Sequence, residues 1–465
     1  MDSQTYGFDM ESYFGQIRYD YNDKYFFHGT LRRDGSSRFA KGQKWGTFGS
    51  IGAAWAITNE NFMKDVSWLK NLKYKLSWGV LGNQDFITNP TIAGYYPYND
   101  LYTIGNLNDE ISFSFKYKGN PDLTWEKAIK WNVGADVKFW GDRIGLTFDY
   151  FMEHRDNILC NRNTVPTIIG ISASNLPAYN MGRMRNSGWD GEISVGDRIG
   201  DWSYFVKANF TYAHNKILEQ DEVIRNEDYL YRTGLRYGQF FGYVADGIFN
   251  SWEEINAAGR PEYVMANNNN KIQPGDVRYV DINGDGKIND DDQVPIGYSN
   301  FPEIMYGISL GGSYKNLDIS LLFQGATHVS NMPSRRIMRG FYEYTGANRD
   351  LLKSWSYERF VNNQKIVYPR YGVNGVGHNY LTSTYWLEDA SYLRLKNVEV
   401  GYTFRQESLK KAGIGSIRIY VNGSNLLTWT DMLPGQDPEV ANAGVTNSEP
   451  YPVTRVFNFG INVNF

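Results

Sequence analysis

The chain ends in Arg455-Val456-Phe457-Asn458-Phe459-Gly460-Ile461-Asn462-Val463-Asn464-Phe465, a stretch in which apolar and polar side chains alternate up to an aromatic last residue. Successive side chains of a β-strand point to opposite faces, so the apolar residues share one face and the asparagines share the other. One face suits lipid and the other suits water. A strand of a soluble β-sandwich shows the same alternation, so the recurrence of the pattern along the chain must decide between the two.

The same two-residue period recurs in about thirteen segments of about ten residues each. At about 3.3 Å per residue and a tilt of about 45°, such a segment rises roughly 25 Å, which is the height of the apolar band of an outer-membrane barrel. The sequence therefore predicts an all-β fold, a transmembrane antiparallel β-barrel. Clear examples begin at Leu72, Trp131, Ile144, Trp202, Leu317 and Ile417.

Short and long connections alternate between these segments. Outer-membrane barrels have short periplasmic turns and long outer loops, and a sandwich has no reason to sort its loops in this way. We therefore expect the long connections to be extracellular. The short turns fall near Asn22, Asn61, Gly141, Arg198, Lys315 and Gln406. The long loops fall at 83–125, 155–185, 214–300, 328–389 and 428–452, with a shorter one at 35–45.

One segment breaks the alternation. Leu393 and Leu395 share one parity, whereas Val398, Val400 and Tyr402 take the other. A β-bulge near Lys396-Asn397 would restore a continuous apolar face. The alternative is a strand whose inner face is partly apolar.

Composition narrows the function classes. The 47 basic and 51 acidic residues leave a net charge of −4, which gives no general attraction for nucleic acid, so nucleic acid is not expected as a partner. Aromatic residues reach 16%, in keeping with the aromatic girdles of a barrel. No run approaches the roughly 18 apolar residues of a membrane helix. Cys160 is alone, which excludes an intrachain disulfide and a four-cysteine zinc site.

The chain is expected to be truncated. Its first residues are polar and contain no leader, and a strand pattern begins by Tyr13. Closed bacterial barrels of a single chain have even strand numbers, whereas about thirteen strands are expected here. The first strand, which ends near Tyr21, therefore needs at least one preceding strand.

Several stretches together carry a resemblance to a known family. They are Leu31–Phe39 (LRRDGSSRF), Trp45–Phe48, Leu72–Gly79 leading to Gly82–Gln84, Met184–Trp189, Gly238–Tyr243 with Asp246–Phe249, Asp389–Asn397 and Tyr451–Phe465. With these blocks in order over nearly its whole length, the chain resembles the SusC-like (RagA-like) TonB-dependent transporters of Bacteroidetes outer membranes. Asp190-Gly191-Glu192 departs from the smoother strand expected after Trp189.

The resemblance implies that residues 1–465 form the carboxy-terminal thirteen or so strands of a barrel of about 22, with the plug domain and early strands absent. It implies a non-enzymatic outer-membrane importer of oligosaccharides or peptides. The implied partners are a SusD-like lipoprotein, the TonB complex acting through the absent plug region, the oligosaccharide or peptide ligand, and membrane lipid including lipopolysaccharide.

A calcium-type motif lies in the 214–300 loop. Asp281, Asn283, Asp285, Asn289 and Asp292 stand at positions 1, 3, 5, 9 and 12 of the EF-hand spacing. Lys287 would offer its carbonyl at position 7, and Gly286 fits the sharp turn. Bound Ca²⁺ would stiffen the loop, although position 12 is Asp rather than Glu and no flanking helices are expected. Without metal, the same residues favour tight turns, and both interpretations stay open.

No substrate-binding or catalytic residue is identified. No His-Glu zinc motif or nucleophile elbow occurs, and adjacent carboxylates such as Glu253 and Glu254 cannot flank a glycosidic bond. A glycoside hydrolase is therefore not favoured, and the competing class is a soluble all-β glycan-binding module with a calcium-stiffened loop. Loop aromatics offer stacking surfaces for sugar rings, with loop packing or contact with the lipoprotein as the alternative. They are Tyr95, Tyr96, Tyr98, Tyr102, Phe240, Phe241, Tyr342, Tyr344, Tyr380 and Trp386.

Overall fold

A computed structural model of the chain describes residues 7–85, 96–107, 110–166, 168, 170, 175–264, 272–342, 346–372, 377–405, 409, 411, 413–440 and 453–465. Tyr95, Tyr344 and Gln406 lie outside these described residues. Within them, no helix is both long enough and apolar enough to cross a membrane.

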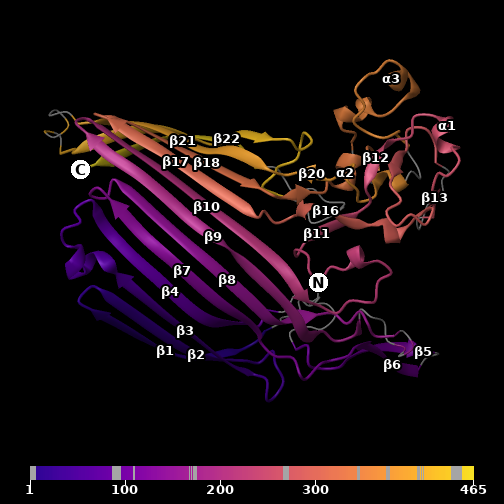
Figure 1. Cartoon of the computed structure of the whole chain (residues 1–465), viewed down its shortest axis with the longest axis horizontal. Helices are drawn as coiled ribbons and strands as arrows, with labels where there is room; N and C mark the ends of the chain where they lie inside the picture. Colours follow the sequence, from indigo (N-terminus) through magenta and orange to yellow (C-terminus); the bar gives the residue numbers. More distant parts are fainter. Residues whose placement is uncertain are drawn as a thin grey trace. The chain divides into compact units, whose positions relative to one another are not determined.

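Thirteen strands join in one sheet, and each strand neighbours the next strand of that sheet along the chain (Figure 1). The pairs are antiparallel, as hairpin connections require. About thirteen strands were predicted from the sequence, and this number is confirmed. The strands are β1 (Met10–Tyr21), β2 (Tyr25–Ser36), β3 (Trp45–Ala56), β4 (Leu69–Asn83), β7 (Glu126–Phe139), β8 (Ile144–Cys160), β9 (Tyr179–Ile199), β10 (Trp202–Glu219), β17 (Ile304–Tyr314), β18 (Leu317–Thr327), β21 (Tyr392–Phe404), β22 (Ser416–Thr430) and β23 (Val456–Asn464).

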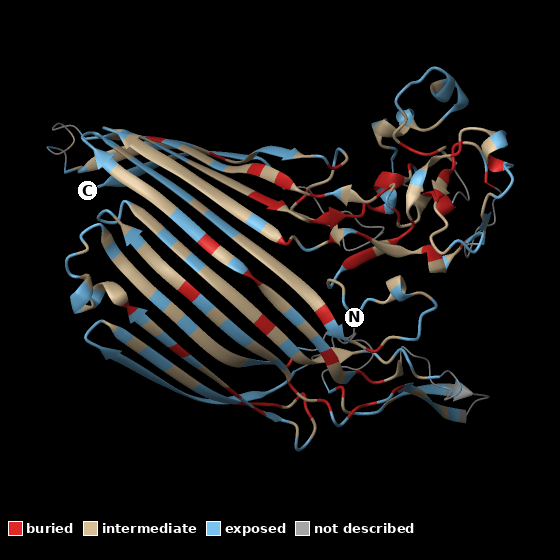
Figure 2. Ribbon diagram, viewed as in Figure 1, coloured by how far each residue is buried: buried red, intermediate tan, exposed pale blue. Residues whose placement is uncertain are grey.

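The apolar face predicted for these strands is open. Leu76, Val133 and Phe459 are 49%, 51% and 81% exposed, although each lies within a strand. Figure 2 shows exposed and intermediate positions along most of the large sheet, while many of the buried positions gather in the connecting loops. A sandwich would cover such a face with a second sheet, and the described residues provide none. An apolar face of this extent suits contact with lipid.

The predicted alternation of short and long connections is confirmed except at 37–44, which is shorter than the turns at 57–68 and 405–415 on the other side. Short turns at 22–24, 140–143, 200–201 and 315–316 close hairpins, and longer turns at 57–68 and 405–415 stand at the same strand ends. The opposite ends carry connections at 37–44, 84–125, 161–178, 220–303, 328–391 and 431–455. The loop expected at 214–300 runs instead from 220 to 303. It starts later because β10 continues to Glu219, and it ends later because β17 begins only at Ile304. Positive φ angles at Asn22 (54°) and Lys315 (53°) give these tight turns the twist of their strands.

The predicted β-bulge is confirmed at Lys396. On one side of β21, Leu322 pairs with Asn397 and Phe323 pairs with Leu395, so Lys396 is skipped. The pairing with β22 shifts between the same two residues, Leu395 and Asn397. The extra residue lets the apolar side chains before and after it share one face of the sheet.

Deletion of Lys396 tests this bulge. Without Lys396, Leu395 and Asn397 become consecutive and keep their partners Phe323 and Leu322, so the strand is regular and its apolar side chains stay on one face. We expect the deletion variant to retain heat-modifiable migration on gels, the usual sign of a folded barrel. Deletion of Ser320 from the regular part of β18 is the matched control and should abolish this migration, because half of the apolar side chains of β18 would turn to the opposite face. Loss of folding in both variants would show that Lys396 is not an extra residue of the strand.

The long connections contain smaller elements. β5 (Leu101–Leu107) pairs with β6 (Glu110–Tyr117), β11 (Gln239–Gly242) with β16 (Val294–Ser299), β12 (Ala245–Ile248) with β14 (Val277–Tyr279), β13 (Glu262–Tyr263) with β15 (Lys287–Ile288), and β19 (Ser330–Asn331) with β20 (Glu388–Asp389). The helices are α1 (Trp252–Ile255), α2 (Arg335–Met338) and α3 (Tyr357–Val361). Three compact apolar cores lie in the described parts of the connections 220–303 and 328–391, because the large sheet directs most of its own apolar side chains outwards.

Candidate functional site

Two long connections fold together into one loop assembly, residues 237–303 and 328–391. The backbone of Tyr243 donates a hydrogen bond to Thr382 O and accepts one from Thr384 N, each at 3.0 Å. Their shared core contains Phe240 and Ile296 from the first connection and Tyr368 and Trp386 from the second. We treat this assembly as the candidate functional site because loops held on a rigid scaffold are where binding surfaces are usually built.

Asp276 is the buried polar centre of the loop assembly, with an exposure of 0%. Its carboxylate accepts hydrogen bonds from the Arg370 guanidinium, from Asn379 Nδ2 (2.9 Å) and from Gln273 N (2.8 Å). His378 Nε2 lies 3.3 Å from the other carboxylate oxygen. Asp276 belongs to the first connection, whereas Arg370, His378 and Asn379 belong to the second, so the carboxylate joins the two.

The electrostatics of this centre favour an ionised carboxylate. Burial alone would raise the pKa of Asp276, but hydrogen bonding and charge from His378 and Arg370 outweigh it and lower the pKa below its ordinary value. A buried charge with this many donors is stable, whereas removing it would leave the partly buried Arg370 without its counter-charge. Asp276 therefore fixes how the two connections fit together.

The calcium-type motif folds back on its own backbone. The Asp281 carboxylate accepts from the backbone N–H groups of Gly284 (2.7 Å) and Gly286 (2.8 Å). Asn283, Asp285 and Asn289 accept from backbone N–H groups two residues ahead, as in Asx turns. The Lys287 side chain is exposed at the start of β15. Among the described residues, no group of three or more His, Cys, Asp and Glu side chains is arranged to hold a metal ion.

Asp292 has a structural role that its place in the motif did not predict. It is fully buried, and its two carboxylate oxygens accept from Ile282 N and Asn289 N, both at 2.8 Å. It thereby ties the start of the motif to its end. Outside the motif, Tyr243 Oη donates to Asp290 Oδ1 at 3.1 Å, which joins the motif to the core of the loop assembly.

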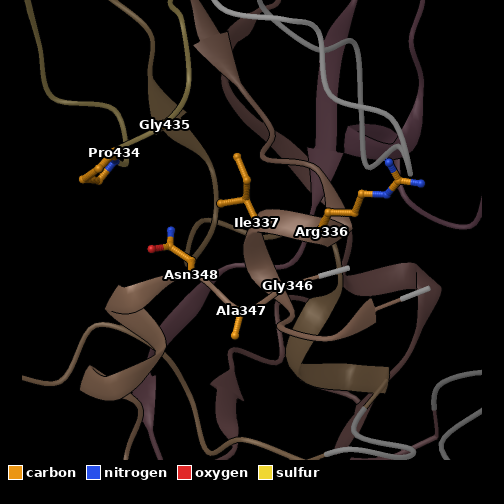
Figure 3. Close-up of a pocket in the computed structure, with 7 residues that line it drawn as sticks. All are labelled: Arg336, Ile337, Gly346, Ala347, Asn348, Pro434 and Gly435. Atoms are coloured by element: carbon orange, nitrogen blue, oxygen red, sulfur yellow. The ribbon is translucent and has the colours of Figure 1, made fainter. Parts of the chain in front are cut away.

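A cavity of about 520 Å³ opens beside the second connection (Figure 3). Arg336 and Ile337 of α2 line it with Asn348, and Pro434 and Gly435 of the β22–β23 connection line it as well. The lining mixes a cation, an amide and apolar carbons, which suits a polar ligand with an apolar part.

The β22–β23 connection is tied to the inner side of β21. Arg394 Nη2 lies 2.7 Å from Asp437, Arg394 Nη1 lies 2.9 Å from Glu439, and Lys396 Nζ lies 2.8 Å from Glu439. The Arg394 side chain is only 3% exposed, so these ion pairs are shielded from water. Hydrogen bonding and the charge of Arg394 lower the pKa of Asp437, although burial acts in the opposite direction.

A family model described as "TonB dependent receptor-like, beta-barrel" matches residues 1–426. The chain belongs to this family. Its members are outer-membrane transporters and not enzymes. The open apolar face and the antiparallel sheet of this receptor barrel agree with that membership.

Curated relatives cover the receptor barrel almost completely. TonB-dependent receptor P3 of Formosa agariphila is 29% identical over 98% of this chain and 46% of its own length. TonB-dependent receptor SusC of Bacteroides thetaiotaomicron is 28% identical over 98% of this chain and 43% of its own length. The chain thus spans about half the length of these relatives. Among solved structures, the RagAB peptide transporter matches with a TM-score of 0.75 and 24% identity, over 98% of this chain and 48% of that one.

Several loop aromatics pack inside the assembly. Phe240 and Trp386 are 6% and 3% exposed and belong to its core, and Tyr380 packs against them. Tyr96 and Tyr102 are exposed at 37% and 58%, so they keep surface available for contact.

Sequence reasoning missed Asp276, because a single aspartate between Gly275 and Val277 carries no motif. It also missed Arg394 and its acidic partners. An arginine on the inner side of a strand was the available signal, but its partners lie 43 residues or more away in the sequence.

Asp276→Ala should loosen the loop assembly without unfolding the sheet. Breaking a buried ion pair costs about 3–5 kcal/mol, because the Arg370 guanidinium, only 19% exposed, would lose its counter-charge. We expect faster proteolysis within residues 237–303 and 328–391, measured by limited digestion, with heat-modifiable migration retained. Asp350→Ala is the matched control, since the Asp350–Lys353 pair is partly exposed and such pairs contribute about 0.2–1 kcal/mol. Equal digestion of both variants would contradict the role given to Asp276.

Proposed function

We propose that this receptor barrel is the channel-forming part of an importer of oligosaccharides or peptides, driven by TonB and working with a SusD-like surface lipoprotein. The observation that carries the proposal is the two-sided character of the sheet in a chain of this family. Apolar side chains occupy one face, as membrane lipid requires, and paired charges occupy the other.

The charged face supports a water-filled interior. Lys75 Nζ lies 2.8 Å from Asp136 and 3.3 Å from Asp149, and all three alternate with apolar neighbours of the opposite face. Arg418 likewise pairs with Asp318 and with Glu399 (2.7 Å). Charges in contact with lipid are costly, so these groups belong to an interior that hydrates them and through which a polar nutrient passes.

The long connections are assigned to the cell surface in this proposal. Residues 220–303 and 328–391 stand at the strand ends opposite the short turns, which in barrels of this kind face the periplasm. The loop assembly then offers the surface on which the lipoprotein closes and from which ligand enters. TonB would act through a plug region, which is not among these residues.

Uptake in cells tests the proposal. We expect a strain lacking the gene to lose growth on either a defined oligosaccharide or a defined peptide mixture as sole carbon source. The complete gene should restore growth, and removal of TonB should abolish it again. A lipoprotein that stays with the protein during purification would support the partner. Unchanged growth on every such nutrient, with the protein present in the outer membrane of the parent strain, would contradict import.

We also propose that the 281–292 motif binds Ca²⁺ and stiffens the surface loop that contains it. Asp281, Asn283, Asp285, Asn289 and Asp292 supply the oxygens, and Lys287 would supply a carbonyl. Gly284 and Gly286 adopt positive φ angles of 73° and 81°, which allow the tight curl of such a loop. Binding would exchange several of the present Asx-turn hydrogen bonds for metal contacts, because the carboxylates now accept backbone N–H groups.

Calorimetry on the purified protein tests the metal site. We expect heat on Ca²⁺ addition that disappears in Asp281→Asn/Asp285→Asn, two substitutions that retain the turn hydrogen bonds but remove charge. Asp228→Asn, an acidic residue outside the motif, is the control. Absence of heat at millimolar Ca²⁺ would remove this proposal and leave the motif as a set of turns.

A further inference from the structure

The ionic clusters on the inner face differ in their ratio of charges. Lys75 is paired with two carboxylates, and Arg418 is paired with two carboxylates. Near the long-loop ends of β7 and β8 the ratio is reversed, because Lys130 and Arg155 share the single carboxylate of Glu153. One of the two cations therefore lacks a full counter-charge in its own cluster.

The geometry of this third cluster leaves donors available. Lys130 Nζ lies 2.9 Å from one oxygen of Glu153, and Arg155 Nε donates to the other oxygen. The Glu153 side chain is 11% exposed, whereas Lys130 and Arg155 are 47% and 52% exposed. Within the part of the chain that the structure describes, the terminal guanidinium nitrogens of Arg155 donate no hydrogen bond. Glu153 thus holds both cations in place while their outer edges stay open.

A pocket of about 210 Å³ lies against these cations. Leu81, Asn83, Glu126, Lys130 and Arg155 line it, and register pairing places them on the side of the sheet opposite Trp131 and Val133. Glu126 also lines the pocket but makes no ion pair with Lys130 or Arg155 among the described residues, and its two oxygens accept from Asn83 Nδ2 (2.9 Å) and Leu159 N (3.1 Å). The pocket is small enough to take an end group rather than a whole oligomer.

We propose that this pocket binds a carboxylate group of the transported ligand, with Arg155 as the principal contact and Lys130 as the second. A planar guanidinium matches a carboxylate in two parallel hydrogen bonds, and such charge-assisted bonds are about twice as strong as neutral ones. Glu153 is the positioning residue. The inference rests on the proposed import function and narrows its ligand to one with a carboxylate, which either a peptide carboxy terminus or an acidic sugar supplies.

Saturation-transfer NMR on the purified protein in detergent tests the pocket with matched probes. The first pair is acetyl-dialanine with a free carboxylate and the same peptide as its amide. The second pair is glucuronate and glucose. We expect the carboxylate member of one pair to bind and its neutral counterpart not to bind, and the pair that responds tells whether the source is peptide or sugar. Added salt should weaken the binding.

Variants tie the signal to the pocket. Arg155→Gln should lower the affinity for the responding probe about tenfold, the equivalent of one charge-assisted hydrogen bond, and Arg155→Lys should lower it less. Arg183→Gln removes an exposed cation outside the pocket lining and is the control. Heat-modifiable migration on gels checks that each of the three variants is folded. Equal binding of charged and neutral probes, no binding of either acid at millimolar concentration, or unchanged affinity in Arg155→Gln would overturn the proposal. Because binding is measured without transport, these results are separate from the growth tests of import.

Discussion

Inside a bilayer no water is present to satisfy backbone N–H and C=O groups, so the strands of a membrane barrel must pair these groups with those of neighbouring strands. The large antiparallel sheet meets this constraint, and the two-residue period of its side chains follows from it. Turning a cation to the lipid side near the middle of the bilayer costs about 2–4 kcal/mol, whereas an exposed ion pair contributes about 0.2–1 kcal/mol. Sorting of side chains between the two faces therefore outweighs any single ion pair within the sheet. The bulge at Lys396 illustrates this rule, because β21 interrupts its regular pairing there and its apolar side chains stay on one face of the sheet.

The long connections obey a different rule. They build small apolar cores and buried ionic contacts of their own, as a soluble domain does, and Asp276 and Arg394 each join segments far apart in the sequence. Buried pairs of this kind fix geometry more than they add stability, since well-packed apolar groups often replace them without loss. In the proposed importer, which would have to present a defined surface and still let a ligand pass, fixed geometry would be the useful property.

The sequence predicted the strands, the sorting of loop lengths and the bulge, because each depends on local periodicity. It placed strand ends less well: β10 extends to Glu219, past the last clearly alternating residue of the sequence. Contacts between loops were not predictable. Asp276 and Arg370 are 94 residues apart, and nothing in the residues around either of them signals the other. Phe240 and Trp386 illustrate the same limit. The sequence around an aromatic loop residue does not show whether its side chain is exposed for ligand binding or buried in a core, and both of these side chains are buried.

Nitroxide scanning of β7 in lipid bilayers tests whether the apolar face of the sheet contacts lipid. Spin labels placed one at a time from Lys130 to Lys138 can be probed by electron paramagnetic resonance with oxygen, which enters lipid, and with a water-soluble nickel complex. We expect strict alternation, with labels at Trp131, Val133 and Val137 relaxed by oxygen and labels at Asn132 and Asp136 relaxed by nickel. Equal access of the nickel complex to both sets, or shielding of the first set from both reagents, would show that this face does not meet lipid.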